Sequence, residues 1–191
     1  MKSILFVRHG KTTPLDKTVP VSQGDPARVL TDEGVARTEE VATDLGSLSF
    51  GLMITSGVPR TMQTGAIIAA KQPKLNDIVS VRSLYMPIDP AETEKLFALF
   101  DAAQTPRLAL AVPKIRRMCE SQAQTILRVC QIFNNPETIV VNHMVLIQII
   151  AYAMGAKDSV LDAKLNPCDG IAVTITDMET SWVPYSAPKA A

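Results

Sequence analysis

The chain has 191 residues, 47% of them hydrophobic and 20% charged, which is typical of a folded globular protein and excludes a disordered chain. Its 19 lysines and arginines balance its 19 aspartates and glutamates, so the charge does not indicate a nucleic-acid binder. No apolar stretch approaches the roughly 20 residues that cross a bilayer, so we expect no contact with a membrane.

The first predicted element is a buried strand at residues 4–7, which leads directly into Arg8, His9 and Gly10. In open α/β sheets, ligands bind just beyond the carboxyl ends of the strands, so Arg8 and His9 are candidate site residues. Residues 11–29 then form a polar loop that contains proline. A loop of this length is either a lid or substrate-contacting loop, or a surface insertion.

Strand and helix patterns alternate along the rest of the chain. One helix is predicted from the capping residues Thr31 and Asp32 to Gly46. The alternation predicts a three-layer α/β/α sandwich with a mostly parallel central sheet, in a single domain over residues 1–185 with a frayed tail at 186–191. The other expected elements are strands at 52–55, 78–81, 138–141, 171–175 and 181–184 and helices at 91–103, 121–133 and 145–154.

A further helix, which begins near Pro59, carries a second arginine. Arg60 lies in its first turn and is expected to project back toward the strand at 52–55, on the same sheet edge as Arg8. The inward stripe of this helix is expected to consist of Met62, Ala66 and Ala69.

The segment 105–118 has no clear periodicity. Its Lys114, Arg116 and Arg117 form either a solvated basic face or a contact for an anionic substrate.

The chain has only two histidines, and each directly follows a predicted buried strand: His9 after residues 4–7 and His143 after residues 138–141. With Arg8 and Arg60, two imidazoles and two guanidiniums should therefore meet at one sheet edge. No aspartate or glutamate flanks either histidine, which disfavours a zinc or iron site. Guanidinium groups match phosphate in a bidentate geometry, so the pattern predicts a phosphate pocket without a metal.

The cysteines and the N-terminal residues indicate in which cellular compartment the protein is expected. Cys119, Cys130 and Cys168 are widely spaced and form no CxxC pattern, so we expect reduced, buried thiols. The apolar run before Arg8 is too short for the core of a signal peptide. We therefore expect a cytoplasmic protein, and its oligomeric state remains open.

Four segments resemble, in order, motifs of the histidine phosphatase superfamily, which is also called phosphoglycerate mutase-like. They are residues 6–12 (FVRHGKT), 30–34 (LTDEG), 56–64 (SGVPRTMQT) and 140–143 (VVNH). Asn142 stands where the family often has serine. In residues 83–90, a leucine is followed by a proline and an acid, which is more similar to the small SixA-type phosphohistidine phosphatase branch.

The resemblance implies a phosphatase in which His9 attacks phosphorus and forms a covalent phosphohistidine that water then hydrolyses. Arg8, Arg60 and His143 would hold the equatorial oxygens, and the two arginines would favour the neutral, attacking form of His9. No cofactor or metal is implied, and the substrate would be a phosphorylated small molecule or a phosphohistidine protein. The candidate substrate-binding residues are Gly10, Thr12, Asn142 and Met144.

The chain departs from the family at two polar positions. Many members carry a glutamate general acid that is absent here, and a family asparagine would fall at Leu15. Asp89 is the first candidate for a replacement acid, with Glu92 and Glu94 as alternatives, although acids near a helix start are also typical caps.

The missing acid leaves several functions open. Imidazole is a good leaving group, so hydrolysis of phosphohistidine makes little demand for an acid. The alternatives are a phosphoglycerate mutase-type phosphotransferase and a phosphate-binding module without turnover.

Overall fold

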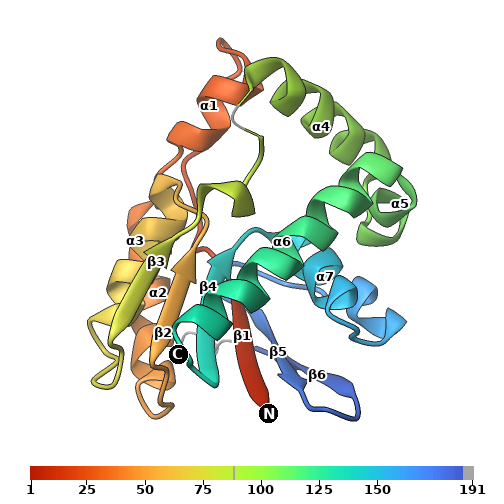
Figure 1. Ribbon diagram of the computed structural model, residues 1–191. Coiled ribbons are helices and arrows are strands. Elements are labelled where there is room, and N and C mark those ends of the chain that lie inside the picture. Colours follow the sequence, from red (N-terminus) through yellow and green to blue (C-terminus); the bar gives the residue numbers. More distant parts are fainter. Residues whose placement is uncertain (88, 187–191) are drawn as a thin grey trace.

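The computed structural model describes residues 1–87 and 89–186, and the part of the expected tail at 187–191 lies outside the described residues. A six-stranded sheet in the order β3-β2-β4-β1-β5-β6 forms the centre (Figure 1). The first four strands in this order are parallel, β5 is antiparallel to β1, and β6 is antiparallel to β5, so the predicted mostly parallel sheet is confirmed. The strands are β1 (Lys2–Arg8), β2 (Leu52–Thr55), β3 (Asp77–Ser80), β4 (Glu137–Asn142), β5 (Gly170–Ile175) and β6 (Thr180–Tyr185).

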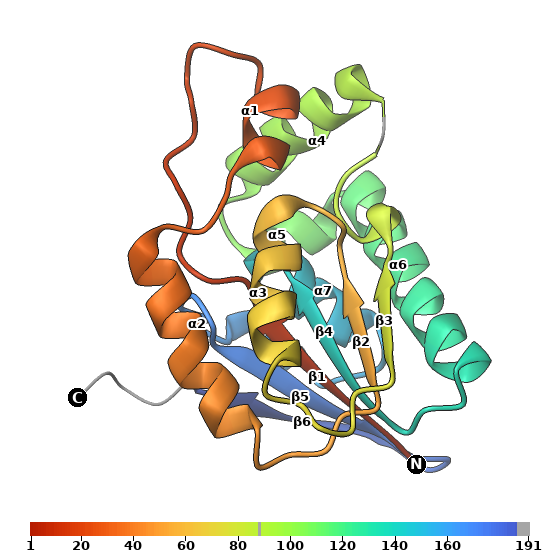
Figure 2. The same cartoon turned by 90° about the vertical axis from the view of Figure 1, so that its left-hand side faces the viewer.

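Helices cover both faces of the sheet, which confirms the three layers (Figure 2). Alternation in β1 explains the two cores, since successive side chains of a strand point to opposite faces. Leu5 and Val7 pack in the cluster beneath α2 and α3, whereas Ile4 and Phe6 pack in the cluster beneath α6 and α7. Burial of each such side chain contributes about 1.5–3 kcal/mol. These four helices are α2 (Asp32–Leu45), α3 (Pro59–Ala69), α6 (Pro113–Ile132) and α7 (Met144–Ala153).

Three helices differ from the sequence predictions: α1 lies in an expected loop, α5 lies in a segment without a predicted element, and α6 begins earlier than predicted. Helix α1 (Val21–Ala27) lies within the expected loop at 11–29. Helix α5 (Pro106–Ala111) and the first part of α6 occupy the segment without clear periodicity, and both helices begin with a proline, which costs nothing at a first helical position. In this segment, the Lys114 ammonium pairs with Glu92.

Helices α1 and α4 (Pro90–Ala103) arch over the carboxyl edge of the sheet (Figure 1). The backbone N–H of Ser22 in α1 donates to Glu94 Oε1 in α4 at 2.7 Å and ties the two helices together. Both helices therefore border the sheet edge at which the candidate site residues were expected.

The expected inward stripe of α3 is wrong at two of its three residues, and only Ala69 packs against the core. Met62 is 49% exposed and Ala66 is also exposed, whereas Arg60, Thr61 and Thr64 are buried. The apolar periodicity misleads because the inner face of α3 carries polar side chains that reach the site. The face is polar for chemical reasons, which a rule based on hydrophobicity does not capture.

Two smaller expectations can be compared directly. Cys119, Cys130 and Cys168 are buried, and none forms a disulfide. Among residues 1–87 and 89–186, no helix is both long and apolar enough to cross a membrane.

Candidate active site

The two histidines meet because β1 and β4 are parallel neighbours. The register pairs Arg8 with Asn142, so the next residue of each strand is a histidine at the same edge. The His9 backbone N–H donates to the Asn142 carbonyl at 3.1 Å, and the ring centroids of His9 and His143 lie 5.2 Å apart. The expected convergence of both imidazoles is therefore present.

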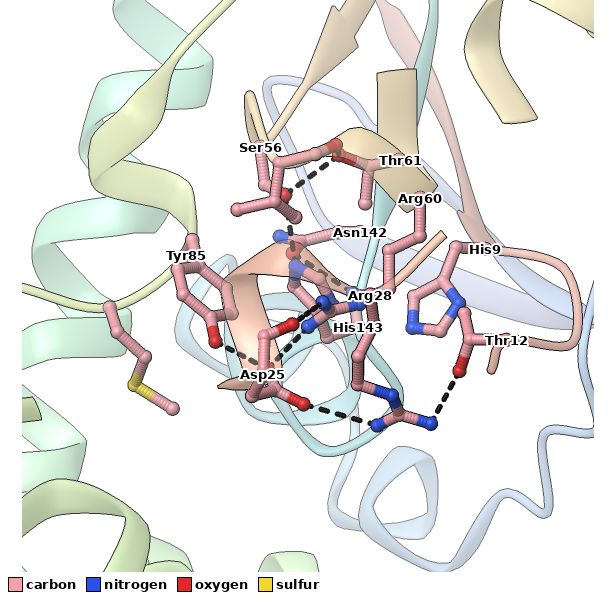
Figure 3. A network of polar contacts seen from close by, with 12 residues as sticks. His9, Thr12, Asp25, Arg28, Ser56, Arg60, Thr61, Tyr85, Asn142 and His143 are labelled. Carbon is pink, nitrogen blue, oxygen red and sulfur yellow. Dashed lines mark hydrogen bonds and ion pairs between the residues drawn. The ribbon is translucent and has the colours of Figure 1, made fainter. Parts of the chain in front are cut away.

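A cavity of about 340 Å³ opens at this edge. Arg8, His9, Arg60 and His143 line it, so the structure brings together four of the five residues that were predicted as catalytic. Thr12 and Met144, two of the predicted substrate-binding residues, also line it. The wall also contains polar residues that sequence reasoning did not identify, namely Asp25, Arg28 and Tyr85 (Figure 3).

His9 is held as a neutral imidazole with one free nitrogen. Its Nδ1 lies 2.8 Å from the Gly10 carbonyl, which can only accept a hydrogen bond, so Nδ1 carries the proton. Nε2 is left with its lone pair. Burial lowers the pKa of His9 to about 3, and the charges of Arg60 and Arg8 act in the same direction. At neutral pH, His9 is therefore the unprotonated base that a nucleophile must be.

This pKa gives a stability prediction. The folded protein holds His9 neutral down to about pH 3, whereas the unfolded chain takes up a proton near pH 6.5, so acid favours unfolding across this window. Relative to His9→Asn, the wild type should lose up to about 2 kcal/mol between pH 7.5 and pH 5. Urea denaturation at both pH values measures the difference. Parallel stability changes in the two proteins would show that the pKa of His9 is ordinary.

His143 is fixed through a chain of hydroxyls. Its Nε2 lies 2.9 Å from Ser56 Oγ, and Ser56 Oγ lies 3.0 Å from Thr61 Oγ1. Thr61 donates its only hydroxyl hydrogen to the Val58 carbonyl at 2.9 Å, so it accepts from Ser56. Ser56 in turn accepts from His143, so Nε2 carries the proton. Only Nδ1 of His143 remains free to contact a ligand.

The surroundings of His143 favour its neutral form. Burial lowers its pKa well below the ordinary value, and the charge of Arg60 adds to the effect. A bound phosphate dianion would oppose both effects, because a nearby negative charge favours the imidazolium. With a proton on Nδ1 as well, His143 would donate to a phosphate oxygen without leaving Ser56.

Arg8 and Arg60 each have one N–H donor that makes no hydrogen bond to the described residues. Within residues 1–87 and 89–186, neither Arg8 Nε nor Arg60 Nε has a hydrogen-bond partner, although both atoms are buried. A buried unsatisfied donor costs about 1–3 kcal/mol. Both arginines line the cavity, so an anion bound there would lie beside two guanidinium groups.

Asp25 is a carboxylate inside this cationic pocket. Its Oδ2 accepts from Arg60 Nη2 at 2.7 Å and from the Tyr85 hydroxyl, and its Oδ1 accepts from Arg28 Nη1 at 3.1 Å. Burial alone raises the pKa of Asp25, but the charge of Arg60 and these hydrogen bonds bring it below its ordinary value. Arg28 also donates hydrogen bonds to Thr12 Oγ1 and to the Thr13 carbonyl.

The candidate acids lie elsewhere. Asp89 is exposed and is the N-cap of α4, where its Oδ1 accepts from the Glu92 backbone N–H at 2.8 Å. Glu92 pairs with Lys114 and Lys95, and Glu94 holds Ser22. None of these three acids lines the cavity.

The other predicted binding residues support the pocket without lining it. Asn142 is fully buried, and its Oδ1 accepts from the His143 backbone N–H at 2.9 Å. A Cβ on Gly10 would lie 2.6 Å from Thr38 Oγ1 and 2.8 Å from the Gly34 carbonyl, so only glycine lets the strand end pack against α2. Gly10 also donates its N–H to Thr64 Oγ1 at 3.1 Å.

We searched the described residues for a group of side chains that could bind a metal ion. In the part of the chain that the structure describes, no group of three or more histidines, cysteines, aspartates or glutamates is placed to hold a metal ion.

Comparisons with known proteins show that several solved structures share this fold. Phosphoglycerate mutase from Bacillus anthracis has a TM-score of 0.67 and 19% identity, over 96% of this chain and 92% of that one. Phosphoserine phosphatase from Entamoeba histolytica, in complex with 3-phosphoglyceric acid, has a TM-score of 0.65 and 15% identity, over 97% of this chain and 98% of that one.

The protein histidine phosphatase SixA, complexed with tungstate, has a TM-score of 0.65 and 12% identity, over 97% of each chain. No curated protein matches the sequence. Residues 4–185 match the histidine phosphatase superfamily (branch 1), and the chain therefore belongs to this superfamily.

Proposed function

We propose that the protein is a metal-independent phosphatase that works through a covalent phosphohistidine on His9. The observation that carries the proposal is the pairing of a neutral His9, with Nε2 free, with two buried arginine donors that have no partner among the described residues. A nucleophile beside unsatisfied cationic donors suits phosphoryl transfer, in which positioning and charge stabilisation supply most of the catalysis.

The mechanism follows from these atoms. His9 Nε2 attacks phosphorus, and the bond from phosphorus to the leaving group breaks as the bond to nitrogen forms. Arg8 and Arg60 hold the equatorial oxygens, and His143 donates from Nδ1 once the dianion has raised its pKa. Water then attacks phosphorus from the opposite side and breaks the bond to His9, which releases inorganic phosphate and restores the neutral imidazole.

Rapid-quench labelling tests this proposal. The enzyme is mixed with a ³²P-labelled phosphate ester in EDTA and quenched in base, in which phosphohistidine survives. A hydrolase shows transient label on His9 followed by release of phosphate, and a mutase transfers the label to a second hydroxyl of an added acceptor. A protein that binds phosphate without turnover shows no label, and a requirement for Zn²⁺ or Mg²⁺ would contradict metal independence.

The cavity wall favours an apolar or aromatic leaving group. Apart from the polar groups, the cavity is lined by Met86, Phe97, Phe100, Met144, Val145 and Leu146. Its lining includes two carboxyl groups, Asp25, which is paired with Arg60, and Asp101, which is exposed. An imidazole fits the apolar wall and leaves without a strong acid, so a phosphohistidine protein is the preferred substrate class over a small phosphate ester.

A leaving-group comparison follows from this reading. The enzyme should cleave phosphohistidine peptides and p-nitrophenyl phosphate about 10²–10⁴-fold faster than glycerol phosphate, because an alkoxide leaves poorly without an acid. Asp89→Asn, Glu92→Gln and Glu94→Gln should leave this ratio unchanged. A selective loss of glycerol phosphate hydrolysis in one of them would identify that residue as the general acid.

A further inference from the structure

Asp25 connects three parts of the chain that are distant in sequence. Besides its two carboxylate oxygens, its backbone carbonyl accepts from Arg60 Nη1 at 2.5 Å. The two terminal nitrogens of Arg60 are thus held by the main chain and the side chain of one residue of α1. Asp25 Oδ1 accepts from Arg28, whereas Oδ2 also accepts from the hydroxyl of Tyr85, which lies in the segment after β3.

These contacts engage both terminal nitrogens of Arg60 and leave each of them a second N–H. Nη1 and Nη2 bind Asp25, whereas Nε is buried and has no partner within the described residues. The guanidinium is rigid and planar, so a carboxylate on one edge fixes the direction of the other donors. Asp25 therefore sets the orientation in which Arg60 faces the pocket.

The charges in the cavity also indicate that Asp25 holds Arg60 in place. Arg8, Arg28 and Arg60 line one cavity, and Arg60 is only 3% exposed. A buried guanidinium without a partner is costly, and it is also repelled by its cationic neighbours. The ionised Asp25 offsets this repulsion when no phosphate is present, so Arg60 can stay buried and in place before the ligand arrives.

We propose that Asp25 is the positioning residue of the phosphate pocket, holding Arg60 and Arg28 oriented for the phosphate oxygens. The proposal rests on the proposed function, because it assigns these arginines to phosphate binding. It also gives the segment 11–29 a definite role: this segment carries the carboxylate that organises the site, as well as Arg28 and Thr12.

Two other roles for Asp25 make different predictions. As a general acid, it would have to be protonated, yet it faces two arginines that favour the carboxylate. As a blocking anion, it would compete with phosphate for the Nη groups of Arg60, and removal of its charge would tighten phosphate binding.

The test compares Asp25→Asn with the wild type, by ³¹P NMR titration of inorganic phosphate and by hydrolysis of p-nitrophenyl phosphate. Loss of the partner of a ligand-holding side chain typically costs about 10–100-fold, so phosphate affinity should fall by about that factor and KM should rise in parallel. Tyr85→Phe, which removes one donor to Asp25 and no charge, should show a smaller loss of affinity, and it remains informative if Asp25→Asn folds poorly. Asp16→Asn, an exposed aspartate of the same loop, controls for the change in net charge.

A mutant cycle with three substitutions separates positioning from a general structural role. If Asp25 acts through Arg60 and Arg28, adding Asp25→Asn to a protein that already carries Arg60→Ala and Arg28→Ala should change phosphate affinity by less than about threefold. An equal loss in that background would overturn the proposal, as would tighter phosphate binding by Asp25→Asn or a loss confined to glycerol phosphate hydrolysis. If the wild type itself neither binds phosphate nor forms labelled His9, the proposed function fails instead.

Discussion

Replacement of His9 by alanine is expected to abolish turnover and the labelled phosphoenzyme while phosphate binding remains measurable. The nucleophile is lost, but Arg8, Arg60 and His143 still line the cavity. Loss of a nucleophile that acts with its partners typically lowers kcat by about 10⁴–10⁶-fold. Initial rates with p-nitrophenyl phosphate and ³¹P NMR titration with inorganic phosphate measure the two effects separately.

His143→Ala is the matched comparison, because it removes the other imidazole of the same pocket. It should slow turnover and still accumulate label on His9, since His143 stabilises the reacting phosphoryl group but does not become phosphorylated. Label in His9→Ala, or hydrolysis by that variant above about one per cent of the wild-type rate, would contradict the assignment of the nucleophile. Thermal denaturation confirms that both variants are folded.

The convergence of His9, His143, Arg8 and Arg60 was predictable because local rules place each of them. Each histidine follows a short β-branched or aromatic run, and such runs form buried parallel strands whose carboxyl ends share an edge. Arg60 follows a strand and a helix-initiating proline. These rules predict the shared edge, and the pairing of β1 with β4 then brings the two histidines side by side.

Asp25 and Arg28 could not be found in this way. Their role depends on contacts with Arg60 and Tyr85, which are 35 and 60 residues from Asp25. The local sequence shows only a polar segment with prolines, and it gives no helical periodicity for the seven residues of α1. Ser56 lies in the segment 56–64 that resembles a family motif, but its importance becomes visible only in the structure, where its hydroxyl contacts His143.

The stripe of α3 failed for a related reason. A helix of a globular protein usually turns its apolar face inward, and Met62 and Ala66 fit that pattern. Here the carboxyl edge of the sheet requires Thr61 beside Ser56, Thr64 beside Gly10 and Arg60 beside Asp25. The site outweighs the hydrophobic pattern, as expected where function competes with packing.

Arg60→Ala should be the most damaging change after the loss of the nucleophile. It removes a donor to the phosphoryl oxygens, and an arginine that stabilises transferring phosphoryl groups is worth about 10³–10⁵-fold in kcat. It also leaves Asp25, which is 7% exposed, without its main cationic partner. Breaking a buried pair costs about 3–5 kcal/mol, and the contacts of Asp25 with Arg28 and Tyr85 should reduce that loss. Steady-state kinetics and urea denaturation measure the two consequences.

The two consequences of Arg60→Ala should separate in the double variant with Asp25→Asn. The neutral amide removes the uncompensated carboxylate, so the double variant should regain part of the lost stability while its activity stays low. Arg60→Lys keeps the charge but lacks the planar group that donates from two nitrogens at once. This variant should therefore be nearly as stable as the wild type, and its hydrolytic activity should still be strongly impaired. Full activity in Arg60→Lys would mean that charge alone suffices at this position. A double variant no more stable than Arg60→Ala would mean that the pair with Asp25 does not hold the fold together.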